Sequence, residues 1–394
     1  MPGSDHADPG LDKRLLVLVA AVLILAMPLI RSALPPKYFY DSVKIQQVAA
    51  GILRFEEDRA FTVTGAAYRW LALEDSPLLV AVLSMLLCYG VVVVAWRDTE
   101  YVSRAQMCLA ALYLLLSAVY LSSYSKDVFV LLVVTVVLTA PRGLAGEFLV
   151  LAAMLGYAAV VRQYWFLVAA AYVAARWTFR GSFRPRAVLV FVVATTVVCA
   201  VVFQVLQGVD LDHFRSVVNE GREGEGDAET AITSFIQGGG LPGSVLSCLL
   251  VLATLLVPIP LLLTGNPLHA VFFVVIASMW VLVGRGVWAR LREGAGAGGD
   301  VRWVRCFALA ASFLLVQSFF EPDYGSYLRH LSPILPAAIY LAGQFRASED
   351  VGQGYCVRPG ERRAAVAHDP GRAWLTADDR GGASRVAERG SRWS

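Results

Sequence analysis

The segment Glu321–His330 combines two carboxylates, an arginine, a histidine and two tyrosines within ten residues. It lies between two strongly apolar runs, Cys306–Phe320 and Leu331–Ala342. Ionisable groups are costly to keep at a membrane boundary, and those that occur there usually serve a function. The segment is therefore the first candidate for a functional site.

The residue types in this segment suit a ligand that has both phosphate and hydroxyl groups. The guanidinium of Arg329 can bind a phosphate through two parallel hydrogen bonds. Glu321 or Asp323 can accept a proton from a sugar hydroxyl, and the rings of Tyr324 and Tyr327 can stack on sugars. Asp323 and the Tyr-Gly pair after it are typical of a turn, so we expect the last helix to begin at Arg329. The alternative is structural, with a Glu321–Arg329 ion pair that braces the turn.

Two further polar islands carry an acid or a lysine at the edge of an apolar run. Asp41 follows the aromatic stretch Tyr38–Tyr40, and a carboxylate beside aromatic rings suits a carbohydrate. Lys126 stands between Ser125 and Asp127, in a chain that uses 30 Arg and only four Lys. A lysine is a compact point charge suited to a phosphate or a carboxylate. In the alternative interpretation Asp127 caps the next helix and Lys126 only extends toward the membrane surface.

The island Arg162-Gln-Tyr164-Trp165 interrupts an apolar stretch. Aromatic residues are common where helices leave a membrane, but an arginine retained there indicates an anionic partner, either a protein carboxylate or a ligand phosphate. Arg69, in the polar stretch after the first apolar run, is a further candidate cation.

Long apolar helices must position these islands. The 394 residues are 57% hydrophobic and 16% charged, with a mean hydropathy of +0.59, whereas soluble domains carry about 25% charged residues. Together with repeated apolar runs, this composition predicts an all-α, polytopic transmembrane helical bundle of about 10–11 spans. The predicted spans are 14–31, 77–96, 105–123, 128–140, 145–161, 164–177, 187–207, 244–264, 268–285, 303–320 and 331–344.

Arginine-rich loops predict the orientation of the bundle. The loops 97–104, 176–186 and 285–305 are basic, and we expect them in the cytoplasm. The loops 32–76 and 208–242 are then external, and all the polar islands lie on that face. The number of crossings agrees with this orientation only if part of 232–264 is a re-entrant or interfacial helix.

The remaining segments are assigned by composition. Residues 1–13 are expected to form a cytoplasmic segment, 14–344 the membrane domain, and 345–394 a disordered, Arg-rich cytoplasmic tail. The bias toward Arg, Ala, Val and Gly is typical of a bacterium with GC-rich DNA, so the expected location is the bacterial cytoplasmic membrane, with multiple passes.

Several function classes are not supported. The cysteines show no Cys-x-x-Cys or Cys/His metal spacing, and no carboxylates cluster closely, so no metal is expected. Nucleotide-binding fingerprints and haem pairs are missing from the sequence, and no cofactor is predicted. The net charge of +3 gives no indication of nucleic acid binding.

The islands Tyr38–Asp41, Ser125–Asp127, Arg162–Trp165 and Phe319–His330, each placed after or before a span, resemble bacterial polysaccharide polymerases of the Wzy and EpsG type. The resemblance covers about residues 14–344. It implies a membrane glycosyltransferase that polymerises undecaprenyl-pyrophosphate-linked oligosaccharide units on the external face of the cytoplasmic membrane. The implied partners are a polyprenyl-linked donor and acceptor, membrane lipid and other polysaccharide assembly proteins.

The resemblance also implies an inverting transfer in which polyprenyl pyrophosphate leaves. Cations would stabilise the charge on the leaving phosphate, and a carboxylate would orient or deprotonate the acceptor hydroxyl. The phosphate-binding candidates are Lys126, Arg162, Arg329 and, in reserve, Arg69; the carboxylate candidates are Asp41, Glu321 and Asp323; and Asp127, Tyr164, Trp165 and Tyr324 complete the binding site.

Two alternatives stay open, besides a non-catalytic membrane scaffold in which the polar islands would only reflect topology. The first is a GT-C transferase that adds one sugar from a polyprenyl-phosphate monosaccharide, with Asp41 as its base. The second is a transporter of lipid-linked sugars, for which internal repeats and a charged site at the membrane midplane would be expected.

Overall fold

A computed structural model describes residues 9–35, 39–54, 58–97, 99, 102–180, 183–221, 230–236, 239–293 and 300–343. All of them belong to one unit of the chain, Met1–Ser348. The expected disordered tail, most of the expected N-terminal segment and the predicted aromatic residue Tyr38 lie outside the described residues.

The predicted all-α bundle is confirmed, and the described residues contain only an isolated bridge between Ala231 and Asp323 in place of a sheet. Each predicted apolar run corresponds to helix. The helices are α1 (Pro9–Ala33), α2 (Tyr40–Ala49), α3 (Arg59–Trp70), α4 (Pro77–Trp96), α5 (Arg104–Tyr120), η2 (Asp127–Phe129), α6 (Val130–Thr139), α7 (Leu144–Val160), α8 (Trp165–Thr178), α9 (Pro185–Gln207), α10 (His213–Glu220), α11 (Gly240–Leu256), α12 (Ile259–Leu263), α13 (Pro267–Glu293), α14 (Val301–Phe320), α15 (Tyr324–Leu331), η5 (Ser332–Ile334) and α16 (Leu335–Gly343).

Four of the described helices, α4, α9, α13 and α14, are long and apolar enough to cross a membrane. Helix α14 is the centre of the bundle, because 89% of its most apolar stretch is buried, against 22% for α9 and for α13. Apolar side chains that stay exposed over most of a long helix are typical of contact with lipid. The protein is therefore a membrane protein.

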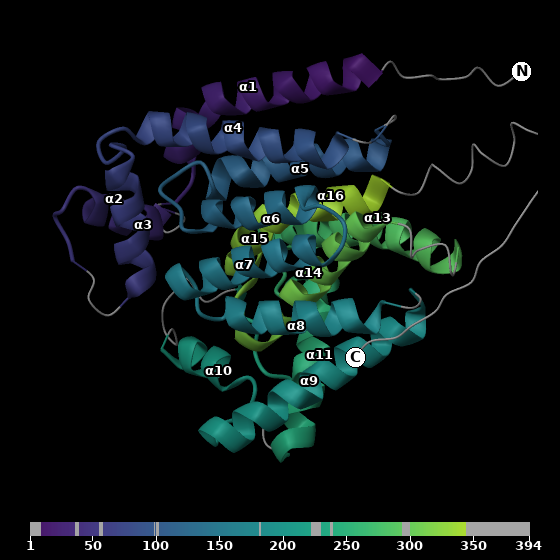
Figure 1. Cartoon of the computed structure of the whole chain (residues 1–394). Coiled ribbons are helices and arrows are strands. Elements are labelled where there is room, and N and C mark those ends of the chain that lie inside the picture. Colours follow the sequence, from purple (N-terminus) through teal and green to yellow (C-terminus); the bar gives the residue numbers. More distant parts are fainter. Residues whose placement is uncertain are drawn as a thin grey trace, which may run out of the picture. The chain divides into compact units, whose positions relative to one another are not determined.

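Helices α1, α4, α5, α6, α7 and α8 run alternately in opposite directions along the bundle, so alternate connections between them lie at the same end (Figure 1). The connections after α1, α5, α7 and α14 share the end at which α2 and α3 lie. The basic connections after α4, α6 and α8 share the other end. The separation of polar islands from basic loops along the bundle, expected from the sequence, is thus present in the arrangement of the helices.

The loop 32–76 contains two helices that the sequence did not predict, α2 and α3. Asp58 caps the start of α3 by accepting a hydrogen bond from the backbone N–H of Ala60 at 2.9 Å. Arg69 donates to the carbonyls of Val48 and Ala49 at 2.6 Å each, and so completes the C-terminal end of α2. Both helices mix polar and apolar residues, so neither has the hydropathy of a span.

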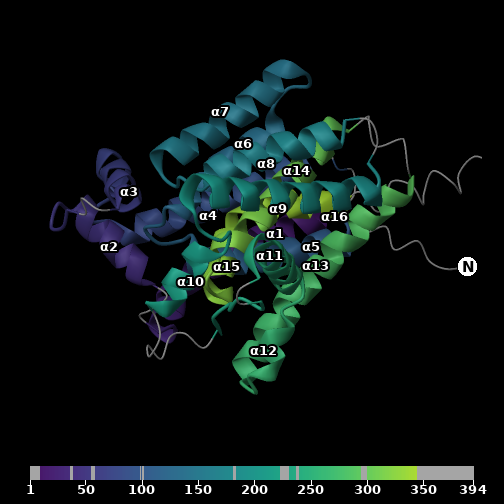
Figure 2. The same cartoon turned by 90° about the horizontal axis from the view of Figure 1, so that it is seen from below.

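The predicted run 244–264 is broken after Leu256, where Pro258 cannot continue the helix. Helix α11 runs across the other helices in Figure 1 and is seen nearly end-on in Figure 2. Its first turns contact the segment after α9, since Ser244 Oγ accepts a hydrogen bond from the N–H of Leu211 at 3.0 Å. This course fits the expected helix in 232–264 that does not cross; its position relative to lipid stays a prediction.

The last predicted span begins later than expected. Asp323 accepts a hydrogen bond from the N–H of Ser326 at 2.7 Å and caps a helix, α15, where the sequence predicted a turn. Arg329 and His330 therefore lie in the last turn of α15 and do not open the final helix. The prediction was wrong because a capped helix of eight residues can include Gly325 when its N-terminus is satisfied by a side chain.

Candidate functional site

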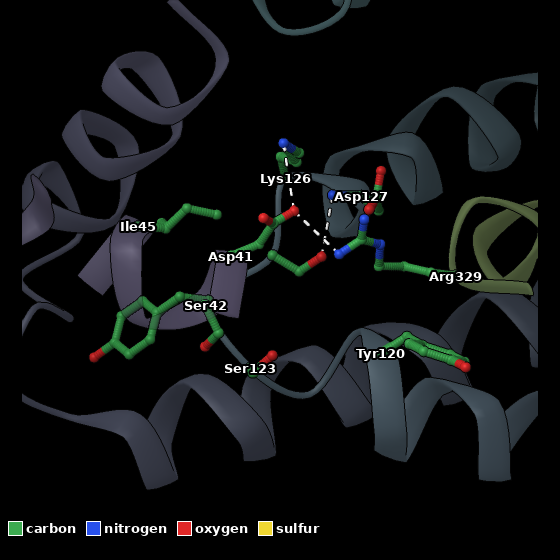
Figure 3. Close-up of a pocket in the computed structure, with 10 residues that line it drawn as sticks. Asp41, Ser42, Ile45, Tyr120, Ser123, Lys126, Asp127 and Arg329 are labelled. Carbon is green, nitrogen blue, oxygen red and sulfur yellow. Dashed lines mark hydrogen bonds and ion pairs between the residues drawn. The ribbon is translucent and has the colours of Figure 1, made fainter. Parts of the chain in front are cut away.

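Three cations and two carboxylates from four separate segments meet at the end of the bundle where α2 and α3 lie. We call Asp41, Lys126, Asp127, Arg162 and Arg329 the charged cluster. Arg329 Nη1 lies 3.0 Å from Asp41 Oδ2, and Lys126 Nζ lies 3.5 Å from the same oxygen. Figure 3 shows these three side chains converging from α2, the loop before α6 and α15. The candidates Asp41, Lys126 and Arg329 are thus brought together.

Arg162 and Asp127 form the second half of the cluster. Arg162 Nη2 lies 3.0 Å from Asp127 Oδ1 and 3.3 Å from Oδ2, and the two side chains are 12% and 3% exposed. No hydrogen bond from the start of the next helix to the Asp127 carboxylate is present among the described residues. The interpretation of Asp127 as a helix cap is therefore wrong, because its carboxylate is engaged by Arg162.

Two tyrosines hold the loop of Lys126 in place. Tyr68 Oη donates to the carbonyl of Ser125 at 3.1 Å and accepts from its N–H at 3.2 Å. Tyr124 Oη donates to the carbonyl of Leu73 at 2.6 Å. Helix α3 therefore fixes the loop, and the ring of Phe61 lies 4.0 Å below Lys126 Nζ as a cation–π partner.

The cluster favours an ionised carboxylate at Asp41. Burial alone would raise the pKa of the Asp41 carboxyl, but Arg329, Lys126 and Arg162 outweigh it and hold that pKa below its ordinary value. Burial and the nearby Arg162 guanidinium lower the pKa of the Lys126 ammonium, against the opposing effect of Asp41. Asp41 is thus a carboxylate at neutral pH, with 28% of its side chain still exposed.

Glu321 pairs with His330, a residue to which the sequence assigned no role. His330 Nδ1 lies 2.9 Å from Glu321 Oε2, and Arg329 pairs with Asp41, so the structural alternative of a Glu321–Arg329 brace is wrong. Burial, with the like charge of Asp323, raises the pKa of Glu321 to about 8. Burial and the surrounding cations hold the pKa of His330 well below its ordinary value. The two groups form a neutral buried pair, which does not suit Glu321 to the role of an ionised base.

The other candidates in this segment are structural. Asp323 caps α15. Tyr324 is 2% exposed and Tyr327 is fully buried, and the hydroxyl of Tyr327 accepts a hydrogen bond from Trp280 Nε1 at 2.9 Å. Neither ring offers a face to a sugar, because the helix that replaces the predicted turn points both into the core.

Of the candidates outside this segment, Trp165 and Arg69 have structural roles and Tyr164 lies near the charged cluster. Trp165 is fully buried against Tyr157, with ring centroids 5.0 Å apart, and belongs to the core. Arg69 is used to close α2. Tyr164 remains near the charged cluster, since the Arg162 guanidinium lies 5.7 Å from its ring centroid.

Two hollows adjoin the charged cluster. A small recess contains Asp41, Lys126 and Arg329, with Ser42, Ser123 and Tyr120 around them (Figure 3). A larger cavity of about 400 Å³ also has Lys126 in its wall. It is lined by Asp58, Arg59, Ala60, Lys126, Ala158, Ala159, Val160, Val161, Arg162, Gln163 and Tyr164. Lys126 lines both hollows and so connects the carboxylate of Asp41 to the larger cavity.

Sequence reasoning missed Phe61, and it placed Asp58 and Tyr68 in a polar stretch on the external side without giving either a role in the site. All three lie on or before α3, and their contribution depends on a helix that hydropathy does not reveal. Within the described residues, no three His, Cys, Asp or Glu side chains gather closely enough to hold a metal ion.

Comparisons with protein-family models, with curated proteins and with solved structures find no match to this chain. The chemistry of the charged cluster is therefore the basis for assigning a function.

Proposed function

We propose that this protein is a multi-pass glycosyltransferase of the bacterial cytoplasmic membrane that takes its sugar from a polyprenyl-linked donor at the external face. One observation carries the proposal. The carboxylate of Asp41 is held ionised by two cations at one end of an apolar helical bundle, beside a cavity with further cations. A base next to a phosphate-binding group is what transfer from a sugar phosphate requires.

In the proposed reaction Asp41 accepts the proton of an acceptor hydroxyl. The hydroxyl oxygen attacks the anomeric carbon as the bond from that carbon to the donor phosphate breaks, and the configuration inverts. The recess around Asp41 is narrow, which suits a single hydroxyl. Glu321 is the weaker choice of base, because it is buried and neutral beside His330.

Negative charge then develops on the leaving phosphate. Lys126 has three N–H donors, of which Asp41 engages one, and Arg162 and Arg329 each offer several more. The carboxylates of Asp41 and Asp127 hold these cations in place before the donor binds. Cations fixed in advance stabilise developing charge without reorganisation.

The sequence resemblance favours polymerisation of undecaprenyl-pyrophosphate-linked units. The dimensions of the site favour a second candidate, transfer of one sugar from a polyprenyl-phosphate monosaccharide. A polymerase holds two lipid-linked oligosaccharides at once, whereas the cavity beside Lys126 measures about 400 Å³. A transporter is disfavoured, since α2 and the connections after α5 and α7, which carry most of the charged cluster, lie at one end of the bundle.

The test uses purified protein in vesicles with lipid-linked saccharides as donors. A ladder of products supports the polymerase, and a single addition supports the second candidate. Arg162→Ala and Arg329→Ala should abolish either product. Arg186→Ala is the control, because Arg186 is an exposed arginine at the start of α9, at the other end of the bundle. Full activity in both cluster variants, or translocation of the lipid without bond formation, would reject the proposal.

A further inference from the structure

We infer that the 400 Å³ cavity between the start of α3 and the end of α7 binds the isoprenoid phosphate carrier of the donor, with the phosphate at Lys126 and Arg162 and the hydrocarbon chain leaving along α7. This inference rests on the proposed function, which requires a polyprenyl-linked donor but does not say where its lipid lies.

The polar side of the cavity suits a phosphate. Lys126 and Arg162 line it, and each has 12% of its side chain exposed, so both cations are largely shielded from water but still accessible. The Nε–H of Arg162 is buried without a hydrogen-bond partner among the described residues. Asp58 also lines the cavity, but its carboxylate is already used to cap α3.

Another part of the cavity lining is apolar. The end of α7 and the residue after it form this wall, from Ala158 to Val161. Ala159 and Val160 are exposed, although a water-filled site for a free sugar phosphate has no need of such surface. A ligand that touches both sides must therefore be amphiphilic.

The apolar wall continues along α7 away from the charged cluster. Phe148, Leu155 and Ala159 are spaced seven and four residues apart, so they lie on one face of the helix. Phe148 is 75% exposed and Leu155 is 43% exposed. A hydrocarbon chain that follows this face passes from the cavity into the apolar region of the bundle surface without crossing polar groups.

The fit to an isoprenoid carrier follows from the placement of Lys126 in both hollows. A phosphate bound at Lys126 lies next to the Asp41 recess, because Lys126 Nζ is 3.5 Å from the Asp41 carboxylate. The sugar on that phosphate is then directed toward the base. A phospholipid shares the phosphate and the hydrocarbon chain, so the experiment must separate the two.

The test measures binding of undecaprenyl phosphate to the full chain in detergent, with no acceptor and no turnover. Ala159→Trp should fill the cavity and weaken binding at least tenfold. Val160→Gln replaces an apolar side chain of the wall with a polar one of similar size, and it should weaken binding several-fold. Ala170→Trp is the matched control, since Ala170 is an exposed alanine on the neighbouring helix α8 that does not line the cavity, and it should bind as the wild type does.

The measurements distinguish failure of this inference from failure of the proposed function. Phosphatidic acid is tested in parallel, and equal affinity for it would overturn the isoprenoid assignment. Wild-type affinity in both cavity variants, with unchanged thermal midpoints, would overturn the site itself. Because no product is formed in this assay, tight and variant-sensitive binding supports the inference even if glycosyl transfer is not found. If transfer is found and Ala159→Trp leaves the KM for the donor unchanged, only the inference fails.

Discussion

Replacing Asp41 with Asn separates catalysis by the carboxylate from binding of the donor. The charged cluster contains three cations and two carboxylates, so its formal charge is +1 in the wild type and +2 in Asp41→Asn. The Asn side chain keeps an oxygen that can accept from Arg329, but it cannot take a proton from a hydroxyl at neutral pH. The change therefore removes the proposed base with little change of shape.

The expected loss in kcat is about 10²–10⁴-fold, the usual contribution of a general base, which corresponds to about 3–5 kcal/mol in the barrier. The KM for the donor should stay the same or fall, because Lys126 and Arg329 lose a competing anion and attract the phosphate more strongly. The free energy of unfolding should fall by only about 1–2 kcal/mol, since 28% of the Asp41 side chain is exposed and solvent screens the lost ion pairs.

The assay is steady-state transfer from a lipid-linked donor by purified protein in vesicles, with a thermal melt of each variant. Asp75→Asn is the control, because Asp75 is an exposed carboxylate in the connection between α3 and α4. A variant Asp41→Asn that keeps more than a tenth of wild-type kcat would refute the assignment of Asp41 as base. A rise in KM with unchanged kcat would also refute it, since the carboxylate would then only position the cations.

Three more predictions follow from groups around the bundle. Glu321 has a folded-state pKa raised to about 8 from the ordinary 4.5, so its contribution to stability is present at low pH and is lost as the pH rises toward 8. Between pH 6.5 and 8, where the buried His330 is neutral, the thermal midpoint of the wild type should fall more steeply than that of Glu321→Gln; parallel curves would contradict the neutral pair. In α7, Gly146→Ala should destabilise the protein by about 1–3 kcal/mol, because an added Cβ would lie 1.8 Å from the carbonyl oxygen of Pro141. A Cβ added at Gly156 meets nothing within 4 Å, so Gly156→Ala should stabilise by up to about 1 kcal/mol. Equal thermal midpoints for the two variants would contradict this packing. Arg215→Ala should lower the free energy of unfolding by about 3–5 kcal/mol, because this fully buried guanidinium pairs with the carboxylate of Asp212 at 3.1 Å and the carbonyl of Ser318 at 2.7 Å. An unchanged denaturant midpoint would contradict this prediction.

The helices of the bundle could be predicted because lipid requires long apolar runs, and these are visible in any hydropathy pattern. The convergence of Asp41, Lys126, Arg162 and Arg329 could also be predicted, since alternation of helix direction brings every second connection to the same end. This argument needs only the number and order of the helices. It does not depend on the conformation of any side chain.

The partner of each charge could not be predicted in this way. Glu321 binds His330 because α15 is a helix, and that helix exists because a side chain caps its start. Arg69 closes α2, a helix without an apolar pattern. Short amphipathic helices at the ends of a bundle carry little sequence signal, and they decide which of several nearby charges meet.

The ion pair between Arg329 and Asp41 joins residues that are 288 positions apart in the chain. A ribosome that adds about 5–20 residues per second completes the first helix roughly 15 to 60 seconds before it makes the partner of Asp41. Of the three cations that lower the pKa of Asp41, only Lys126 and Arg162 are synthesised during that interval. The charged cluster is therefore complete only once α15 has been synthesised, and a product terminated before α15 would contain helices α1 to α14 without the Arg329–Asp41 ion pair.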